Sequence, residues 1–357
     1  MNTLTYLHGA PTTTADIRSE NADFVVQEIL PFTMMGEGEH HLLYIQKDGL
    51  NTVEVAERLS KFAKVHPRDV SYAGQKDKNA VTEQWFCVRI PGKETPDWQS
   101  LNGERLTVLQ VTRHNKKLRI GALSGNRFKL TLRNVVGMDA LLERLDQVKQ
   151  LGVPNYFGEQ RFGNDGANIQ KARDMFAGKK VKSGNQKAMF LSAMRSLVFN
   201  QVVTYRLAQH QLQPLTGDCV MLAGSRSFFT VEQWDDELLG RLASRDIQIS
   251  APLWGEGELP ALADAAVVEL AALAGYESDL AGLAKFDLKQ ERRPLLLLAD
   301  NFSWQQLSDN AITLDFILPA GAFATSVLRE LAQYQDMADV RRQQWLAERE
   351  QQEGDNA

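Results

Sequence analysis

The sequence predicts an α+β fold with a mixed, largely antiparallel sheet. Strand patterns occur at residues 24–30 and 42–46, the first of them a continuous apolar-leaning run, and as alternating apolar and polar residues at 106–111 and 128–132. These runs do not alternate regularly with helical segments, as the strands of a parallel α/β sheet do. The chain has 357 residues, of which 43% are hydrophobic, and this is enough for two domains with separate cores.

Two helices are predicted in the first part of the chain. Asn51 can cap a helix that continues to about residue 64, because apolar residues recur there at helical spacing. A second helix begins at Asp139, and Gly152 followed by Pro154 ends it. We therefore expect helices packed on the sheet and a domain boundary after residue 152.

The following segment is predicted to be mainly helical. Apolar residues recur at helical spacing over residues 187–209, and residues 262–285 are rich in Ala and Leu, which is typical of packed helices. Strand patterns return at residues 295–298 and 312–318, and a helix is expected from about residue 323 to residue 334. The chain therefore leaves the first domain and later returns to it.

A charged loop is predicted between two strands near residue 77. The β-favouring residues 70–73 end at Gly74, and an alternating run resumes at residue 84 and continues to Pro91. Asp77 lies in the polar segment between them. Loops held by strands commonly carry catalytic groups, although a surface hairpin with solvated charges explains the same pattern.

Five ordered blocks of the chain resemble the TruD family of tRNA pseudouridine synthases. The block that contains Asp77 is Gly-Gln-Lys-Asp-Lys-Asn-Ala-Val-Thr at residues 74–82. The others are Asp-Phe-Val-Val-Gln-Glu at 23–28, Gly-Asn-Arg-Phe at 125–128, Asn-Tyr-Phe-Gly-Glu-Gln-Arg-Phe-Gly at 155–163 and Pro-Ala-Gly-Ala-Phe-Ala-Thr-Ser at 319–326. One block alone is weak support, whereas five in order are a specific match.

The resemblance implies a pseudouridine-synthase-like catalytic domain that contains an insertion. Residues 1–152 are expected to form its first part, and residues 295–335 its second part. Residues 153–294 are expected to form the inserted, mainly helical α/β TRUD domain. The charged residues 336–357 are expected to form a surface helix that frays at its end.

The resemblance also implies roles for six residues. Asp77 is expected to be the nucleophile, and Arg18, at a position where the family tends to have Lys, is expected to pair with it. Attack at C1′, attack at C6 and removal of the C2′ proton all remain open. Four further residues are expected to hold the target nucleotide by stacking, apolar contact or hydrogen bonding: Phe24, Asn126, Phe128 and Phe323.

The charge distribution is uneven, although the net charge is −5. Residues 1–210 contain 29 Lys and Arg against 21 Asp and Glu, whereas the remaining residues contain 11 against 24. Such asymmetry suggests one surface suited to a polyanion, although basic clusters are also compatible with solvated hairpins. Six residues are candidates for contact with an RNA backbone: Lys76, Lys78, Arg113, Lys116, Lys117 and Arg119.

The expected function is conversion of uridine to pseudouridine, at uridine 13 in the D-arm of tRNA(Glu) as the family resemblance implies. The isomerisation requires no cofactor, and the chain has no recognisable metal-ligand motif. No membrane span or signal peptide is evident, and two cysteines do not form a disulfide framework, so we expect a cytoplasmic monomer. Two alternatives are a noncatalytic RNA-binding or RNA-folding protein on the same scaffold and an aspartate-dependent hydrolase.

Overall fold

The computed structural model describes residues 4–92, 94–210 and 212–354, and its chain divides into two units, each made of three segments. The sheet unit comprises Thr12–Glu143, Ala299–Gly321 and Ala332–Ala357. The helical unit comprises Met1–Pro11, Arg144–Leu298 and Ala322–Leu331. Each unit is therefore assembled from residues that lie far apart in the sequence.

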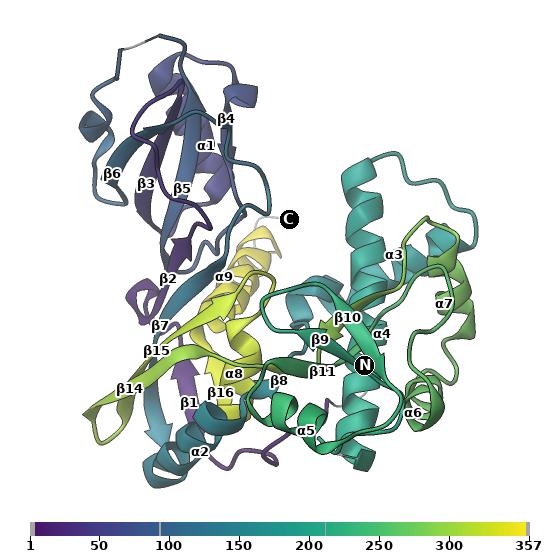
Figure 1. Ribbon diagram of the computed structural model, residues 1–357. Helices are drawn as coiled ribbons and strands as arrows, with labels where there is room; N and C mark the ends of the chain where they lie inside the picture. Colours follow the sequence, from purple (N-terminus) through teal and green to yellow (C-terminus); the bar gives the residue numbers. More distant parts are fainter. Residues whose placement is uncertain (1–3, 93, 211, 355–357) are drawn as a thin grey trace. The chain divides into compact units, whose positions relative to one another are not determined.

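A ten-stranded mixed sheet organises the sheet unit (Figure 1). Its strands are β1 (Thr14–Ile17), β2 (Phe24–Ile29), β3 (His40–Asp48), β4 (Val70–Tyr72), β5 (Val81–Arg89), β6 (Leu106–His114), β7 (Gly125–Val136), β14 (Asp300–Ser308), β15 (Ala311–Pro319) and β16 (Gln333–Asp336). The main path is β14-β15-β7-β2-β5-β3-β6, while β1 pairs with β7 and β16, and β4 pairs with β5. In this sheet β2–β5 and β1–β16 are parallel, and the other pairs described are antiparallel. The predicted fold class is confirmed.

Helix α1 (Thr52–Ala63) covers a buried part of this sheet. It begins after Asn51, as predicted, although the Asn51 side chain makes no capping hydrogen bond. Lys64 ends the helix in the left-handed conformation, with φ of 52°. The inward residues Val55 and Leu59 pack with Phe86 and other apolar residues of β3, β5 and β6. This packing holds together α1 and the strands β4 and β5, which the loop that contains Asp77 connects.

The end of the chain differs from the prediction. Helix α8 (Ala324–Leu331) stops before residue 334, and residues 333–336 form β16. The predicted helix is too long because Gln333–Asp336 pair in register with β1, and strand pairing satisfies backbone groups that a helix would otherwise satisfy. Helix α9 (Met337–Gly354) follows and is largely exposed, as expected for a surface helix.

The helical unit is built around α4 (Gly184–His210). This is the helix predicted at 187–209, and it extends slightly further at both ends. The other helices are α2 (Met138–Leu151), whose first residues belong to the sheet unit, α3 (Ala167–Phe176), α5 (Asp236–Ala243), α6 (Ala263–Ala272) and α7 (Glu277–Ala284). The strands are β8 (Val153–Pro154), β9 (Asp218–Leu222), β10 (Phe228–Val231), β11 (Ile247–Leu253), β12 (Glu291–Pro294) and β13 (Leu296–Leu297).

A four-stranded antiparallel sheet in the order β10-β9-β11-β12 packs against α4 (Figure 1). The strand predicted at 295–298 is reduced to β13, which pairs with β8. In the ranges that the structure describes, no helix has both the length and the apolar character needed to cross a membrane.

Candidate active site

Asp77 lies in the loop between β4 and β5, and side chains from outside that loop hold its backbone in place. The Lys76 backbone N–H donates to the Thr52 hydroxyl at 3.0 Å. That hydroxyl donates to Gln84 Oε1 at 2.8 Å, and Gln84 Nε2 donates to the Gly74 carbonyl at 2.9 Å. Since Thr52 and Gln84 are both buried, the first half of the loop has a fixed conformation.

The Lys76 side chain points into the protein. Its Nζ lies 2.5 Å from Glu28 Oε1, and the other oxygen of Glu28 accepts the Trp85 backbone N–H at 3.0 Å. The side chains of Lys76 and Glu28 are 7% and 0% exposed. The environment of Lys76 therefore does not support the predicted contact with an RNA backbone, because a buried carboxylate already occupies its ammonium group.

Lys47 binds the backbone of the loop from the protein interior, and the sequence analysis did not identify it as a site residue. This side chain is fully buried, and its Nζ donates to the carbonyl oxygens of Leu50 at 2.7 Å and Asp77 at 3.1 Å. Burial lowers the pKa of Lys47 to about 8, against the raising effect of the Asp77 charge. The available signal was its spacing, since Leu43, Ile45 and Lys47 alternate along one inward face of β3.

Arg18 binds the Asp77 carboxylate. Arg18 Nη2 lies 3.2 Å from Asp77 Oδ2, while Nη1 donates to the carboxylate of Asp336. The Asp77 side chain is 44% exposed, whereas that of Arg18 is 7% exposed. One carboxylate oxygen of Asp77 is thus oriented by a buried cation while the group stays accessible to a ligand.

The segment that follows β16 fixes Arg18. Arg18 directly follows β1 and has a φ of 54°, a left-handed conformation that costs a non-glycine residue about 1 kcal/mol. Arg341 of α9 donates to the backbone carbonyls of Arg18 at 2.9 Å and Ser19 at 2.8 Å. Together with Asp336, these bonds hold a strained residue in place, so part of the expected surface tail supports the site.

One of the predicted aromatic residues, Phe24, lies next to Arg18, and a second, Phe128, contacts Phe24. Its guanidinium carbon is 3.8 Å from the centroid of the Phe24 ring. Phe24 meets Phe128 edge to face, with ring centroids 6.4 Å apart, and Phe128 stacks on Phe316 at 5.6 Å. A continuous series of contacts therefore connects Asp77, Arg18, Phe24 and Phe128.

Asn126 lies two residues before Phe128 on β7, so both side chains lie on the same face of the sheet. In the register of β2 and β7, Val26 is opposite Phe128, and Glu28 is opposite Asn126. The Asn126 Oδ1 atom is buried and has no hydrogen-bond partner among the described residues. Buried acceptors are nearly always satisfied, so this oxygen is available to a donor on a ligand.

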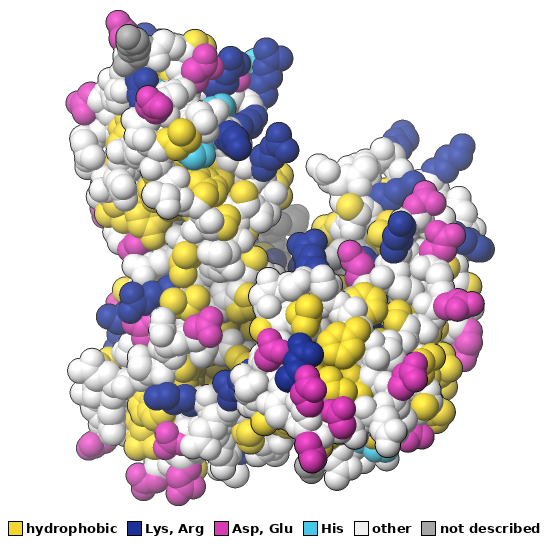
Figure 2. Space-filling model, viewed as in Figure 1, with side chains coloured by type: hydrophobic (Ala, Val, Ile, Leu, Met, Phe, Trp, Pro, Cys, Tyr) yellow, Lys and Arg dark blue, Asp and Glu magenta, His cyan; other side chains and the backbone are white. Residues whose placement is uncertain are grey.

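The remaining predicted residues have different environments. Phe323 belongs to the helical unit, where its ring centroid lies 6.0 Å from that of Phe157. Arg113 donates to the backbone carbonyls of Gly92 and Glu94, which gives it a structural role in addition to any ligand contact. Figure 2 shows Lys and Arg side chains gathered on the body that contains α1 and β3–β6. Four of the predicted basic residues are exposed: Lys78, Lys116, Lys117 and Arg119.

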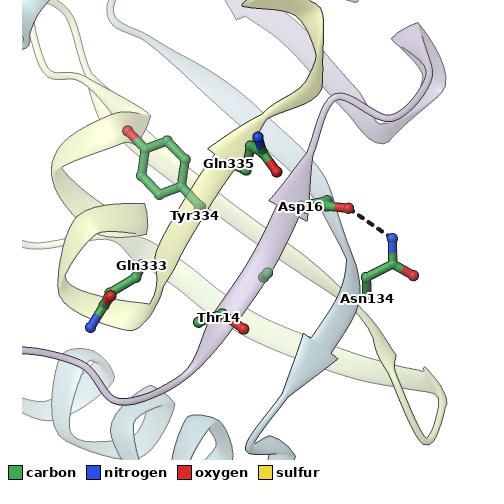
Figure 3. Close-up of a pocket in the computed structure, with 7 residues that line it drawn as sticks. Thr14, Asp16, Asn134, Gln333, Tyr334 and Gln335 are labelled. Atoms are coloured by element: carbon green, nitrogen blue, oxygen red, sulfur yellow. Dashed lines mark hydrogen bonds between the residues drawn. The ribbon is translucent and has the colours of Figure 1, made fainter. Parts of the chain in front are cut away.

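A separate pocket lies along β1 and β16 (Figure 3). Its lining consists of Thr14, Ala15, Asp16, Asn134, Gln333, Tyr334 and Gln335. Asp16 accepts a hydrogen bond from Asn134 at 2.7 Å, and Figure 3 shows these two side chains directed toward one another. Asp77 does not line this pocket, so the pocket is not the predicted site of uridine isomerisation.

The chain is similar to proteins of one known family. A sequence profile described as tRNA pseudouridine synthase D (TruD) matches residues 1–171 and 167–331. Proteins named tRNA pseudouridine synthase D from Shewanella oneidensis and Aeromonas hydrophila are 60% and 49% identical to it. These alignments cover 97% and 93% of this chain and 92% and 95% of the relatives.

A solved structure is similar in fold. The crystal structure, from Methanosarcina mazei, is described provisionally as tRNA pseudouridine synthase D (TruD), and it matches with a TM-score of 0.73. The match covers 92% of this chain and 95% of that chain at 23% sequence identity. At this identity the likeness shows a shared fold.

Proposed function

The chain belongs to the tRNA pseudouridine synthase D (TruD) family, and we propose that Asp77 is the carboxylate with which it isomerises uridine. As a tRNA pseudouridine synthase it is an isomerase. The observation that carries the proposal is the Asp77 carboxylate itself, which is half exposed, bonded to Arg18 and connected through that guanidinium to Phe24 and Phe128.

The reaction breaks the N1–C1′ bond of uridine and forms a C5–C1′ bond. The C5 proton is lost and N1 gains a proton, so the composition of the nucleotide does not change. Asp77 acts by attack at C1′, by attack at C6 or by removal of the C2′ proton, and each route uses one ionised carboxylate beside the sugar. The Arg18 contact supports this role because it orients Asp77 and stabilises its negative charge.

The neighbouring residues hold the uracil in the proposed site. The target nucleotide leaves the RNA stack, and its base contacts the Phe128 ring beside Phe24. Asn126 Oδ1 accepts a hydrogen bond from the base, which supplies the donor that this buried oxygen lacks among the described residues. Phe323, which belongs to the helical unit, is proposed as a further residue that contacts the RNA substrate.

The proposed substrate is uridine 13 in the D-arm of tRNA(Glu), as for the family that the sequence resembles. RNA of this kind is recognised through its shape, its phosphates and its unstacked bases. The exposed residues Lys78, Lys116, Lys117 and Arg119 are suited to contacts with the phosphates, and Arg113 is a further candidate. We assign catalysis to the sheet unit, and to the helical unit we assign the TRUD insertion and a second RNA-binding surface.

The reaction involves no net oxidation or group transfer, and the proposal includes no cofactor or metal ion. Within the described ranges, no three His, Cys, Asp or Glu side chains are grouped as metal ligands would be. We propose that the protein acts as a monomer in the cytoplasm, where its buried thiols Cys87 and Cys219 stay reduced.

The test is incubation of the purified protein with unmodified tRNA(Glu) and a mixture of other tRNAs, followed by mapping of pseudouridines. The proposal predicts stoichiometric modification at position 13 of tRNA(Glu). Modification at another position would reject the substrate assignment alone. Tight tRNA binding without any pseudouridine would reject the activity and establish the alternative of a noncatalytic RNA-binding protein.

A further inference from the structure

Arg161 carries a half-buried guanidinium that no carboxylate of the described residues reaches. Its Nη1 lies 3.4 Å from the Ser192 hydroxyl, a long contact with a neutral group. Burial lowers the pKa of Arg161, because its charged form has lost water without gaining an anion. Removing an unpaired charge from water costs free energy, so the arrangement does not serve the fold alone.

Two aromatic rings border this guanidinium. The Arg161 guanidinium carbon lies 5.7 Å from the ring centroids of both Phe157 and Phe323. The two rings meet at an angle of 64° with centroids 6.0 Å apart. Phe157 is buried, whereas Phe323 is partly exposed, so one ring of the pair is accessible beside the cation.

A second arginine increases the positive potential at the same place. The guanidinium carbon of Arg293 lies 4.2 Å from the Phe157 centroid, and its Nη2 donates to Asn155 Oδ1 at 2.5 Å. Burial and the positive charge of Arg161 lower the pKa of Arg293 to about 10. Two like charges at one ring repel each other, and an anion bound between or beside them would relieve the repulsion.

Two arginines of this unit that are almost fully buried are each paired with a carboxylate. Arg206 lies 2.5 Å from Asp218, and Arg292 lies 2.5 Å from Glu269, with all four side chains almost fully buried. A buried cation that stabilises a fold is ordinarily paired in this way. Arg161 departs from this pattern, which indicates a cation reserved for a ligand.

We propose that Arg161 binds a phosphodiester group of the RNA substrate, with Arg293 adding to the positive potential and Phe323 contacting the adjoining nucleoside. This inference rests on the proposed function, since that function makes RNA the ligand. A guanidinium presents a planar pair of donors that suits a phosphate. An aromatic ring at its edge suits a nucleoside, so the two together fit a nucleotide better than they fit a free inorganic anion.

The test compares Arg161→Gln, Arg161→Lys and the control Arg173→Gln. Arg173 belongs to the same unit, but it is paired with Asp279 at 2.8 Å. The dissociation constant for tRNA is measured over a series of salt concentrations. We expect Arg161→Gln to weaken binding roughly 10-fold and to reduce the slope of log affinity against log salt by about 0.7–0.9. Arg161→Lys should retain the slope, and Arg173→Gln should change neither quantity.

Thermal unfolding separates binding from a structural role. Because Arg161→Gln removes an unpaired charge, the variant should unfold at the same temperature as the wild type or at a higher one. A lower unfolding temperature, or an unchanged affinity and salt slope, would overturn the inference. If the wild type modifies tRNA while Arg161→Gln binds it normally, the proposed function survives and this inference fails. If the wild type neither binds nor modifies tRNA, the proposed function fails with it.

Discussion

Arg18 makes three contacts within the proposed active site. It forms ion pairs with Asp77 and Asp336, and its guanidinium lies over the Phe24 ring at 3.8 Å. A planar guanidinium can satisfy two carboxylates and an aromatic face together, whereas a lysine ammonium is a compact point charge. At this position the geometry of the cation is therefore as important as its charge.

Replacement of Arg18 by lysine should preserve the fold and reduce catalysis. The variant retains a positive charge but loses the two-sided contact with Asp77 and Asp336. Loss of one charge-assisted hydrogen bond in the transition state corresponds to roughly 10- to 100-fold in kcat. Single-turnover pseudouridine formation measures the effect. Arg127→Lys, which changes an exposed pair with Asp315, is the control, and equal rates for the two variants would contradict the assignment.

Lys47 should give the protein a distinctive pH dependence. Its pKa is about 8 in the folded protein and 10.5 in its ordinary state, so between these values the unfolded chain binds more protons at this group. Stability therefore gains a contribution that rises with pH over this range and is absent below about pH 8, where both forms are protonated. Denaturant unfolding between pH 7 and pH 10 measures it.

Lys47→Met provides the comparison. The variant should lose this rise in stability with pH, and kcat should fall roughly 10-fold because the Asp77 carbonyl loses its donor. An identical pH profile of unfolding in wild type and variant would show that Lys47 does not titrate as described.

The individual site residues differ in how far the sequence could identify them. Asp77, Arg18, Phe24 and Phe128 lie in or near blocks that resemble a known family, so roles could be suggested before the structure. Asp336 could not be found in this way, since it is 318 positions from Arg18 and the contact depends on strand pairing. Such a contact leaves no local pattern in the sequence.

The parallel pair β1–β16 joins the first and the last of the three segments that form the sheet unit. Ile17 is paired with Asp336, so Arg18 follows one strand where Asp336 ends the other. Parallel strands place their carboxyl ends at the same edge of a sheet, which explains why the two side chains meet. The element that precedes α9 is therefore part of the support for Arg18.

Asp336→Asn should weaken both stability and catalysis. The substitution preserves shape but removes one negative charge from a buried arginine, which should cost about 1–3 kcal/mol of unfolding free energy. With Arg18 less well held, kcat should fall several-fold. Asp339→Asn, at an exposed position on α9, is the control for a change of net charge. Equal kcat values for Asp336→Asn and the wild type would show that Asp336 does not position Arg18.

The long, strongly patterned elements were predictable, and the short pairing strands were not. The strands β2, β3, β6, β7 and β15 and the helices α1, α2 and α4 follow clear apolar periodicities. β1 and β16 have four residues each, and Gln333–Asp336 is wholly polar or aromatic, so no apolar alternation identifies it. There, tertiary pairing overrides the helical pattern that leads up to it.

Each unit of the molecule depends on segments from distant parts of the chain. In the helical unit, the buried Glu330 accepts the backbone N–H groups of Leu7 and His8, each at 3.2 Å. The Tyr156 hydroxyl donates to the Thr5 carbonyl at 3.0 Å, and Ser326 donates to the Tyr156 carbonyl at 2.9 Å. The first residues of the chain and α8 thus complete the helical unit.

A fragment of residues 144–298 should therefore be less stable than the same unit in the intact protein. It lacks the residues of α8 and of the N-terminal segment, and it leaves Tyr156 and its apolar neighbours exposed. We expect a low unfolding temperature and weak cooperativity in a thermal melt. Joining residues 4–11 and 322–331 to the fragment through flexible linkers should restore a cooperative transition, and full stability of the fragment alone would contradict this account.

At the scale of the whole molecule, the sequence predicted the fold class correctly, because strand and helix patterns are distributed unevenly along the chain. The limits of a unit built from three segments are harder to predict. Local periodicity identifies elements, but membership of a unit depends on which distant elements share a core. Leu4 and Leu7 pack against the core of the helical unit, although the segment that follows them, Thr12–Glu143, belongs to the sheet unit.

The central claim is that the Asp77 carboxylate performs the isomerisation. The most direct test is pseudouridine formation in tRNA by Asp77→Asn, measured in a single turnover beside Asp315→Asn, which removes another aspartate of the same unit. The account predicts that Asp77→Asn folds and binds tRNA like the wild type but forms no pseudouridine, while Asp315→Asn remains active. Pseudouridine formation by Asp77→Asn at the wild-type rate would contradict the claim.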